Sequence, residues 1–128
     1  MGPRDLDSGK IELARRDTRT KEVLEYDGID NYIKNLLDEI QESLYNRAFE
    51  HRKSNTHQVD SYEDFKKQIK NGGFFLAHWD GTKETELLIK EQTQATIRCI
   101  PLNDDIETGK CMVTGKESKR RVVFAKAY

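Results

Sequence analysis

The chain has 128 residues, of which 35% are hydrophobic and 35% are charged, and its formal net charge is −1. This length allows one domain, or a small domain with part of another. The net charge argues neither for nor against a nucleic-acid partner, and no apolar run approaches the ~18 residues of a membrane span, so no membrane partner is expected.

The two cysteines, Cys99 and Cys111, are too few for a disulfide framework, and no apolar signal segment precedes the domain. We therefore expect a cytoplasmic protein. The high charged fraction could indicate disorder, but the hydrophobic periodicity along the chain instead predicts a folded domain with a heavily solvated surface.

The sequence of residues 1–28 indicates part of a larger β-sheet. Residues 2–9 contain the glycine, proline and aspartate that are typical of a turn. Residues 10–15 and 21–26 follow as two candidate strands of a hairpin, the first with clear polar–apolar alternation. Because two strands alone are marginally stable, residues 1–28 are interpreted as the trailing strands of another domain.

Residues 29–54 carry the clearest helical pattern and are interpreted as a linking helix. Apolar side chains recur at the three-four spacing of one helical face. They are Ile29, Tyr32, Ile33, Leu36, Leu37, Ile40, Leu44, Ala48 and Phe49.

Residues 55–128 predict a further domain. A short helix opens at residues 60–63 with Tyr62, Phe65 and Ile69 inward, and residues 71–73 end it. A second helix is expected over residues 83–91, with Leu87 and Leu88 inward. Strands are expected over residues 74–79 (buried on both faces), 96–101 and 121–125, with an acidic loop over residues 103–109.

The predicted fold class is α/β (α+β) with two layers. Helices pack on one face of a small mixed sheet, and a long helix and an N-terminal hairpin remnant precede this domain.

No self-sufficient catalytic constellation stands out. Cys99 and Cys111 lack the partners of a closed zinc site, so Cys99 is interpreted as a buried small hydrophobe and Cys111 as a loop thiol. A hydrolase that uses histidine needs a nucleophile on a sharp turn and an acid that orients the imidazole, and none of the three histidines has this sequence context. Neither Gly72–Gly73 nor Gly115–Lys116 fits a phosphate-binding loop. The aromatic residues Phe74, Phe75 and Trp79 are expected in the core.

The basic end of the chain is more ambiguous. Residues 93–128 carry seven basic and four acidic side chains, whereas residues 54–92 carry five and seven. The run Lys119, Arg120 and Arg121 is either a solvated face or a patch that contacts RNA phosphates without reading sequence.

A series of short motifs, taken in order, is similar to one family. Residues 2–6 and 13–17 look like the end of a class II anticodon-binding domain, and the remaining motifs resemble the extra C-terminal domain of prolyl-tRNA synthetases of the archaeal and eukaryotic type. These motifs are residues 55–56, 60–62, 74–81, 97–101, 109–111, 114–116 and 124–128.

The resemblance implies a role as an accessory domain that is inert alone. The parent enzyme of such a domain joins proline to its tRNA with ATP and magnesium, and is expected to be a homodimer. Its partners would be the proline tRNA and the catalytic domain, toward whose active site the terminal carboxylate of Tyr128 would reach.

The resemblance also implies a degenerate zinc site. Many relatives bind zinc through four cysteines, and those positions fall here on Asp80, Thr85, Cys111 and Thr114. Threonine is a poor zinc ligand, so we expect no zinc, with packing of the turns in its place. We also expect Asp80 to cap the helix that follows through Gly81 and Thr82.

Two other interpretations stay open at this stage. One is a free-standing RNA-binding or translation-factor-like α/β module, and the other is a metal-dependent structural module.

Overall fold

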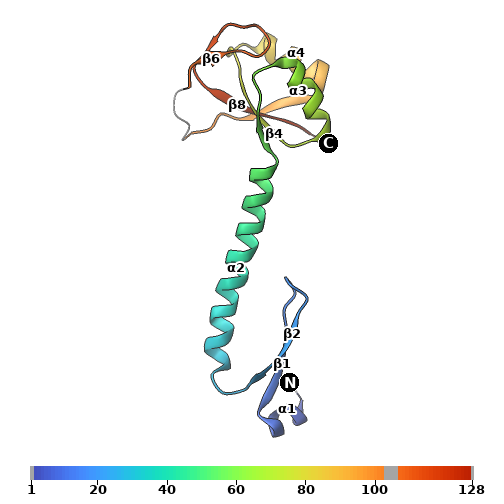
Figure 1. Cartoon of the computed structure of the whole chain (residues 1–128), viewed down its shortest axis with the longest axis vertical. Coiled ribbons are helices and arrows are strands. Elements are labelled where there is room, and N and C mark those ends of the chain that lie inside the picture. The colour runs from blue at the N-terminus through green and yellow to red at the C-terminus, as the bar shows by residue number, and fades with distance from the viewer. Residues whose placement is uncertain (1, 103–106, 128) are drawn as a thin grey trace. The chain divides into compact units, whose positions relative to one another are not determined.

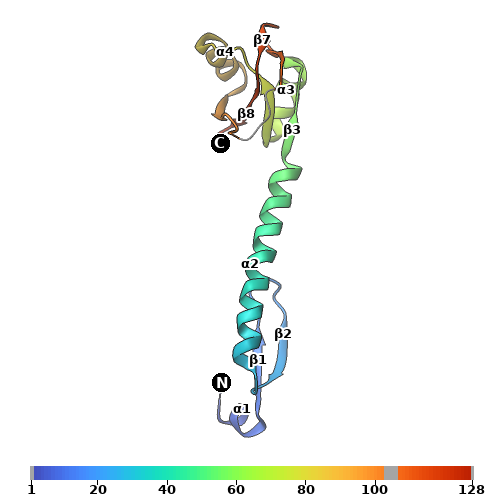
Figure 2. The same ribbon diagram turned by 90° about the vertical axis from the view of Figure 1, so that its left-hand side faces the viewer.

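The structure is a computed structural model that describes residues 2–102 and 107–127, and the chain divides into two compact units, residues 1–51 and 52–128. Figures 1 and 2 show the elements of each unit. Among the described residues, no helix has the length and apolarity that crossing a lipid bilayer requires.

The N-terminal unit begins with a short helix where a turn was expected. Helix α1 spans Pro3–Ser8. Proline suits its first turn, the Asp5 carboxylate accepts a hydrogen bond from the Gly2 amide at 2.6 Å, and Gly9 ends the helix in the left-handed conformation. The turn-forming residues therefore serve as the two ends of a helix.

The expected hairpin is present. Strands β1 (Lys10–Ala14) and β2 (Lys21–Glu25) pair antiparallel, with Ile11 opposite Leu24. Among the described residues these two strands form a sheet of their own.

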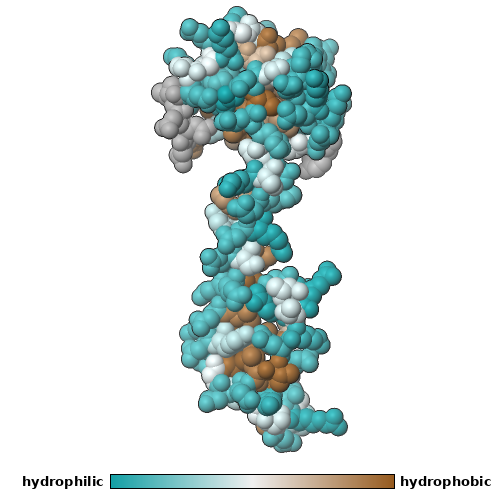
Figure 3. All heavy atoms as spheres, in the orientation of Figure 1, coloured by the Kyte–Doolittle hydropathy of each residue, from teal (hydrophilic) through white to brown (hydrophobic). Residues whose placement is uncertain are grey.

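Helix α2 (Ile29–Ser54) confirms the predicted long helix, but little of its apolar face is covered. Leu36 is its one buried residue among those described. The Tyr32 hydroxyl donates to Glu22 Oε1 at 2.7 Å, and Arg15 pairs with Glu39 at 2.8 Å, so the hairpin contacts the first half of the helix. Hydrophobic atoms remain at the surface of this unit (Figure 3), and Leu37 is 60% exposed.

The C-terminal unit contains a four-stranded mixed sheet in the order β3-β4-β8-β5 among the described residues. The strands are β3 (Thr56–Gln58), β4 (Phe74–His78), β5 (Ala95–Cys99) and β8 (Arg121–Lys126). Strand β3 pairs parallel with β4, and β8 pairs antiparallel with both β4 and β5. The last strand of the chain is therefore central in the sheet, which agrees with its apolar sequence.

Helices and turns complete this unit. Helix α3 (Tyr62–Gln68) continues into the 3-10 helix η1 (Ile69–Asn71), and helix α4 spans Lys83–Thr93. Strands β6 (Gly109–Lys110) and β7 (Glu117–Ser118) form a small separate hairpin.

The core lies between the two helices and one face of the sheet. Phe65 packs edge-on against Phe75 and Phe124, with ring centroids 5.7 and 5.5 Å apart. Ile69 from η1 and Ile89 from α4 belong to the same cluster. The predicted two-layer fold, with helices on one face of a mixed sheet, is confirmed.

The inward face of α4 was predicted wrongly. Leu87 is 52% and Leu88 38% exposed, whereas Thr85 and Ile89 are buried. Strand β4 is also less enclosed than expected, because Phe74 is 41% exposed while Phe75 is 1% exposed. Since alternate residues of a strand point to opposite faces, only one of these two rings reaches the core.

Candidate functional site

The carboxylate of Asp80 is the centre of a hydrogen-bonded cluster in the C-terminal unit. Its Oδ1 atom accepts from the amide and the hydroxyl of Thr82, at 3.1 and 2.8 Å. Its Oδ2 atom accepts from the hydroxyls of Thr85 and Thr114, at 3.0 and 2.9 Å. One carboxylate thus binds groups from three parts of the chain: the turn after β4, the first turn of α4 and the turn between β6 and β7.

Local sequence explains how this cluster forms. Gly81 adopts a φ of +80°, a left-handed conformation that favours glycine, and so reverses the chain after Asp80. Thr82 then caps α4, with its side-chain oxygen accepting from the Thr85 amide. Asp80 therefore supports the helix cap by binding the capping residue, which agrees with the cap through Gly81 and Thr82 that we expected.

The hydrogen bonds also set the charge of this carboxyl. Partial burial raises the pKa of Asp80, but the hydrogen bonds from Thr82, Thr114 and Thr85 outweigh it and leave this pKa below its ordinary value. Asp80 is therefore a carboxylate at neutral pH.

Three of the four positions that the resemblance equated with zinc ligands are joined in this cluster: Asp80, Thr85 and Thr114. The fourth, Cys111, is 3% exposed and begins the turn that contains Thr114. Its carbonyl accepts from the Gly115 amide at 2.9 Å, and its amide donates to Lys116 O at 2.8 Å.

The donor set of these four positions fits a zinc ion poorly, since one thiol, one carboxylate and two hydroxyls replace the thiolates and imidazoles that zinc prefers. Within residues 2–102 and 107–127, no group of three or more histidine, cysteine, aspartate or glutamate side chains could hold a metal ion.

The prediction for Cys99 is wrong, because this residue is exposed at the end of β5. Cys111 lies outside the helices and strands, as predicted for a loop thiol, and its side chain is buried. A bulge between Ile97 and Cys99 shifts the strand register, which changes the face that Cys99 would otherwise present.

A second cluster surrounds Arg121, one of the three predicted RNA contacts. Its guanidinium donates to both carboxylate oxygens of Glu107, at 3.0 and 3.1 Å, and to Asp60 Oδ1 at 2.6 Å. It also donates to the Val59 carbonyl at 3.2 Å. Arg121 is only 9% exposed, so its structural setting differs from that of a surface phosphate contact.

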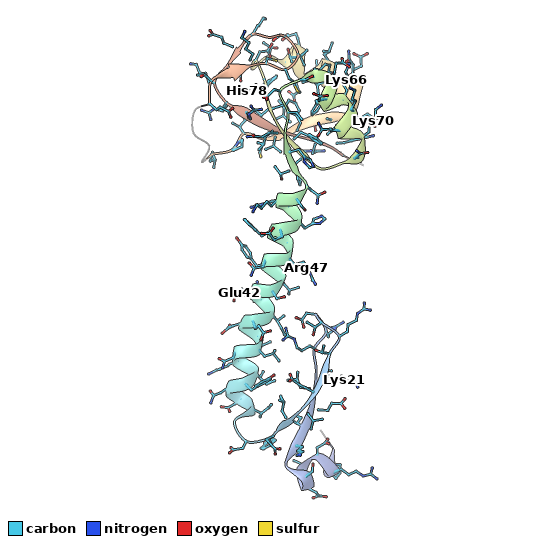
Figure 4. The ribbon with its side chains drawn as sticks, viewed as in Figure 1. Lys21, Glu42, Arg47, Lys66, Lys70 and His78 are labelled. Carbon is cyan, nitrogen blue, oxygen red and sulfur yellow. The ribbon has the colours of Figure 1, made fainter. Side chains whose placement is uncertain are left out.

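His78 lies beside this cluster, at the end of β4 (Figure 4). Its Nδ1 is 3.2 Å from the Ser118 hydroxyl, and its Nε2 is 3.7 Å from Glu107 Oε1. Any side chain at position 109 would collide with the His78 ring, so Gly109 is required for this close approach. The hydrogen bonds that Glu107 accepts from Arg121 are the main reason why the pKa of Glu107 lies below its ordinary value.

The other two predicted RNA contacts, Lys119 and Arg120, are exposed in the turn between β7 and β8. Tyr128 lies outside the described residues, as does the 103–106 part of the predicted acidic loop. The pairing of Arg121 with Glu107 and Asp60 could not be predicted from the sequence because its partners lie 14 and 61 positions away, beyond any local pattern.

The chain is closely similar to proteins of one named family. Residues 62–128, just over half of the chain, match the family described as "Prolyl-tRNA synthetase, C-terminal". Over all 128 residues the chain is 59% identical to a protein of Porphyromonas gingivalis and 58% identical to one of Parabacteroides distasonis, each named "Proline--tRNA ligase". A protein of Cytophaga hutchinsonii with the same name is 54% identical over 129 residues. The chain spans 26% of the length of each of these relatives.

Proposed function

The chain belongs to the prolyl-tRNA synthetase C-terminal family, and from this membership we propose that it acts as the C-terminal part of a ligase that joins proline to its tRNA. The observation that carries the proposal is the match of the entire chain to proteins named proline–tRNA ligase, together with the family match over residues 62–128.

The chemistry of the reaction belongs to the rest of such a ligase. Activation of proline consumes ATP with magnesium, and we assign both to the catalytic domain, which we also expect to form the homodimer. The partners of the present chain are then that catalytic domain and the proline tRNA, in the cytoplasm. The chain alone is inert.

Within this function the C-terminal unit has an accessory role. We assign to the terminal carboxylate of Tyr128 a part in supporting the catalytic site, where shifts of about 1 Å alter rates. We assign to the Asp80 cluster the structural task that a zinc ion performs in many relatives, because its four hydrogen bonds join the same three chain segments. Zinc is therefore expected to be absent. Lys119 and Arg120 are retained as candidate RNA contacts.

A chimera tests the proposal. The matching 26% of the Porphyromonas gingivalis ligase is replaced by this chain, and proline-dependent aminoacylation of the proline tRNA is measured. We expect the chimera to aminoacylate and the 128-residue chain alone to show no turnover. A folded chimera without activity, or turnover by the chain alone, would contradict the proposal.

The role of Tyr128 is tested in the same chimera. Its deletion should lower kcat/KM for aminoacylation while the melting temperature stays unchanged. The substitution Tyr128→Phe keeps the terminal carboxylate in place and is the matched control. Equal activity of the deletion variant and the unaltered chimera would remove this assignment.

A further inference from the structure

A surface pocket of about 360 Å³ lies between α3–η1 and the C-terminal end of α4. Three lysines line it, and each comes from a different element: Lys66 from α3, Lys70 from η1 and Lys126 from β8. Figure 4 shows Lys66 and Lys70 along this helical stretch. Glu91 is the acidic residue among the described lining residues, so the lining carries an excess of positive charge.

The walls of this pocket are held by contacts from the core and between the helices. Ile69 lines the pocket and is 1% exposed, which anchors η1 to the core. The Tyr62 hydroxyl donates to Gln92 Oε1 at 3.0 Å and so links α3 to α4. Lys126 stands opposite Ala95 in the sheet register, beside the end of α4. The backbone positions of the three lysines are therefore held by the fold.

One of the lysines already has a partner. Lys66 pairs with Glu63 and lies 4.9 Å from the centroid of the Tyr62 ring. Glu63 is 70% exposed, and ion pairs between exposed side chains contribute little to stability, so the ammonium can exchange this carboxylate for a phosphate at little cost.

The chemistry of the lining identifies the class of ligand. Small-molecule pockets are mostly apolar and enclosed, whereas this one is open and lined by lysine, glutamine and threonine side chains. Lysine ammonium groups act as point charges that bind phosphate without reading a base sequence.

We propose that the pocket lined by Lys66, Lys70 and Lys126, here called the lysine pocket, binds the phosphate backbone of RNA. The proposal rests on the proposed function, which makes the proline tRNA a partner of the chain. The lysine pocket is separate from Lys119 and Arg120, because those residues precede β8 whereas Lys126 ends it. At about 3.3 Å per residue, the strand places some 20 Å between the two.

The test measures binding of a fluorescently labelled proline tRNA transcript to the 128-residue chain by anisotropy, from 50 to 200 mM salt. The main variant combines Lys66→Gln, Lys70→Gln and Lys126→Gln. Lys67→Gln is the matched control, because Lys67 is exposed on the same helix but does not line the pocket. Lys119→Gln with Arg120→Gln forms a third variant. Circular dichroism melts verify that each variant is folded.

We expect the triple variant to lose roughly tenfold or more in affinity, with a salt slope lower by about 2 to 3, and Lys67→Gln to bind as the unaltered chain does. Equal affinity and slope for the triple variant would overturn the proposal. So would an absence of binding by the unaltered chain, or a loss confined to the Lys119 and Arg120 variant.

Three other anions, polyglutamate, inorganic phosphate and ATP, distinguish the class of ligand that the pocket binds. Polyglutamate that displaces the tRNA as effectively as unlabelled RNA would assign the pocket to acidic protein surfaces and overturn the proposal. Inorganic phosphate or ATP that binds with the same lysine dependence, without RNA binding, would also overturn it. The chimera experiment does not depend on these lysines, so failure of the lysine pocket and failure of the ligase role are separate outcomes.

Discussion

The Thr114 hydroxyl donates a hydrogen bond of 2.9 Å to Asp80 Oδ2, although the two residues lie 34 positions apart. This bond joins the turn between β6 and β7 to the turn that starts α4. The Asp80 carboxylate also accepts bonds from Thr82 and Thr85. It therefore reinforces a junction of two turns to which Met112 also contributes, through its place in the core and the hydrogen bond of 3.1 Å that its amide donates to the His78 carbonyl.

Removal of the Thr114 hydroxyl should destabilise the C-terminal unit. Thr114→Ala removes one of the donors to the Asp80 carboxylate. Hydrogen bonds to charged groups contribute about 1.5–3 kcal/mol to stability. Because Thr114 is exposed, we expect the free energy of unfolding to fall by about 1 kcal/mol. Thr114→Ser keeps the donor and should retain most of the stability. Urea unfolding followed by Trp79, the single tryptophan, measures both. Equal losses in the two variants would show that the hydroxyl contributes nothing.

Stability should fall at acidic pH in part through Asp80. The pKa of Asp80 is lower in the folded chain than its ordinary value, so its carboxylate stabilises the fold above the unfolded pKa of about 4. This contribution is lost as pH falls through the lower, folded pKa.

The test compares the unfolding free energy of the unaltered chain and Asp80→Asn between pH 7 and pH 3. Because an asparagine side chain does not titrate, the difference between the two chains should be largest at pH 7 and shrink toward pH 3. A difference that stays constant over this range would rule out the titration of Asp80 as a source of stability.

Local patterns were sufficient to predict the long helix α2, the central strand β8 and the core positions of α3, because each has an uninterrupted hydrophobic period. They were insufficient where tertiary contacts decide. Thr85 faces inward because its hydroxyl donates to Asp80, and Ile89 lies on the same face one turn later. Since these two residues define the inward face of α4, Leu87 and Leu88 face solvent. Strand β3 was not predicted, because its three residues are too few to show the polar–apolar alternation of a strand.

The Asp80 cluster shows a similar limit. The resemblance supplied the four positions Asp80, Thr85, Cys111 and Thr114, but the hydrogen bonds among them depend on two turns that are distant in sequence. In the run from Lys119 to Arg121, the pattern gave three equivalent cations. Only the position of Arg121 in β8, between Asp60 and Glu107, separates it from its two neighbours.

Arg121 should therefore matter for stability and Arg120 should not. Arg121→Ala removes a guanidinium that, among the described residues, donates to five acceptor atoms on Glu107, Asp60, Val59 and Leu76. Since Glu107 and Asp60 are 51% and 79% exposed and can be solvated, we expect a loss of roughly 1–3 kcal/mol, below the 3–5 kcal/mol of a fully buried pair. Arg120→Ala should change stability by less than about 0.5 kcal/mol.

Urea unfolding of the two arginine variants and of the unaltered chain provides the comparison. Losses of equal size for Arg120→Ala and Arg121→Ala would contradict the structural role of Arg121, because they would indicate a general effect of removing positive charge from this segment.

Restoration of thiolates at the degenerate positions should create a zinc site. The unaltered chain is expected to purify with little zinc, and EDTA should leave its melting temperature unchanged. A variant that combines Asp80→Cys, Thr85→Cys and Thr114→Cys places three thiols at positions that the hydrogen bonds to Asp80 already bring together, and Cys111 lies in the same turn as Thr114. Four thiolates are a complete ligand set for structural zinc. Zinc should therefore raise the melting temperature of this variant, and EDTA should reverse the effect.

Elemental analysis gives the zinc stoichiometry, and the same variant with Cys111→Ser is the control with three thiols. Stoichiometric zinc in the unaltered chain would mean that the Asp80 cluster does not take the place of the metal. No zinc in the four-cysteine variant would mean that these four positions do not come together as a metal site requires.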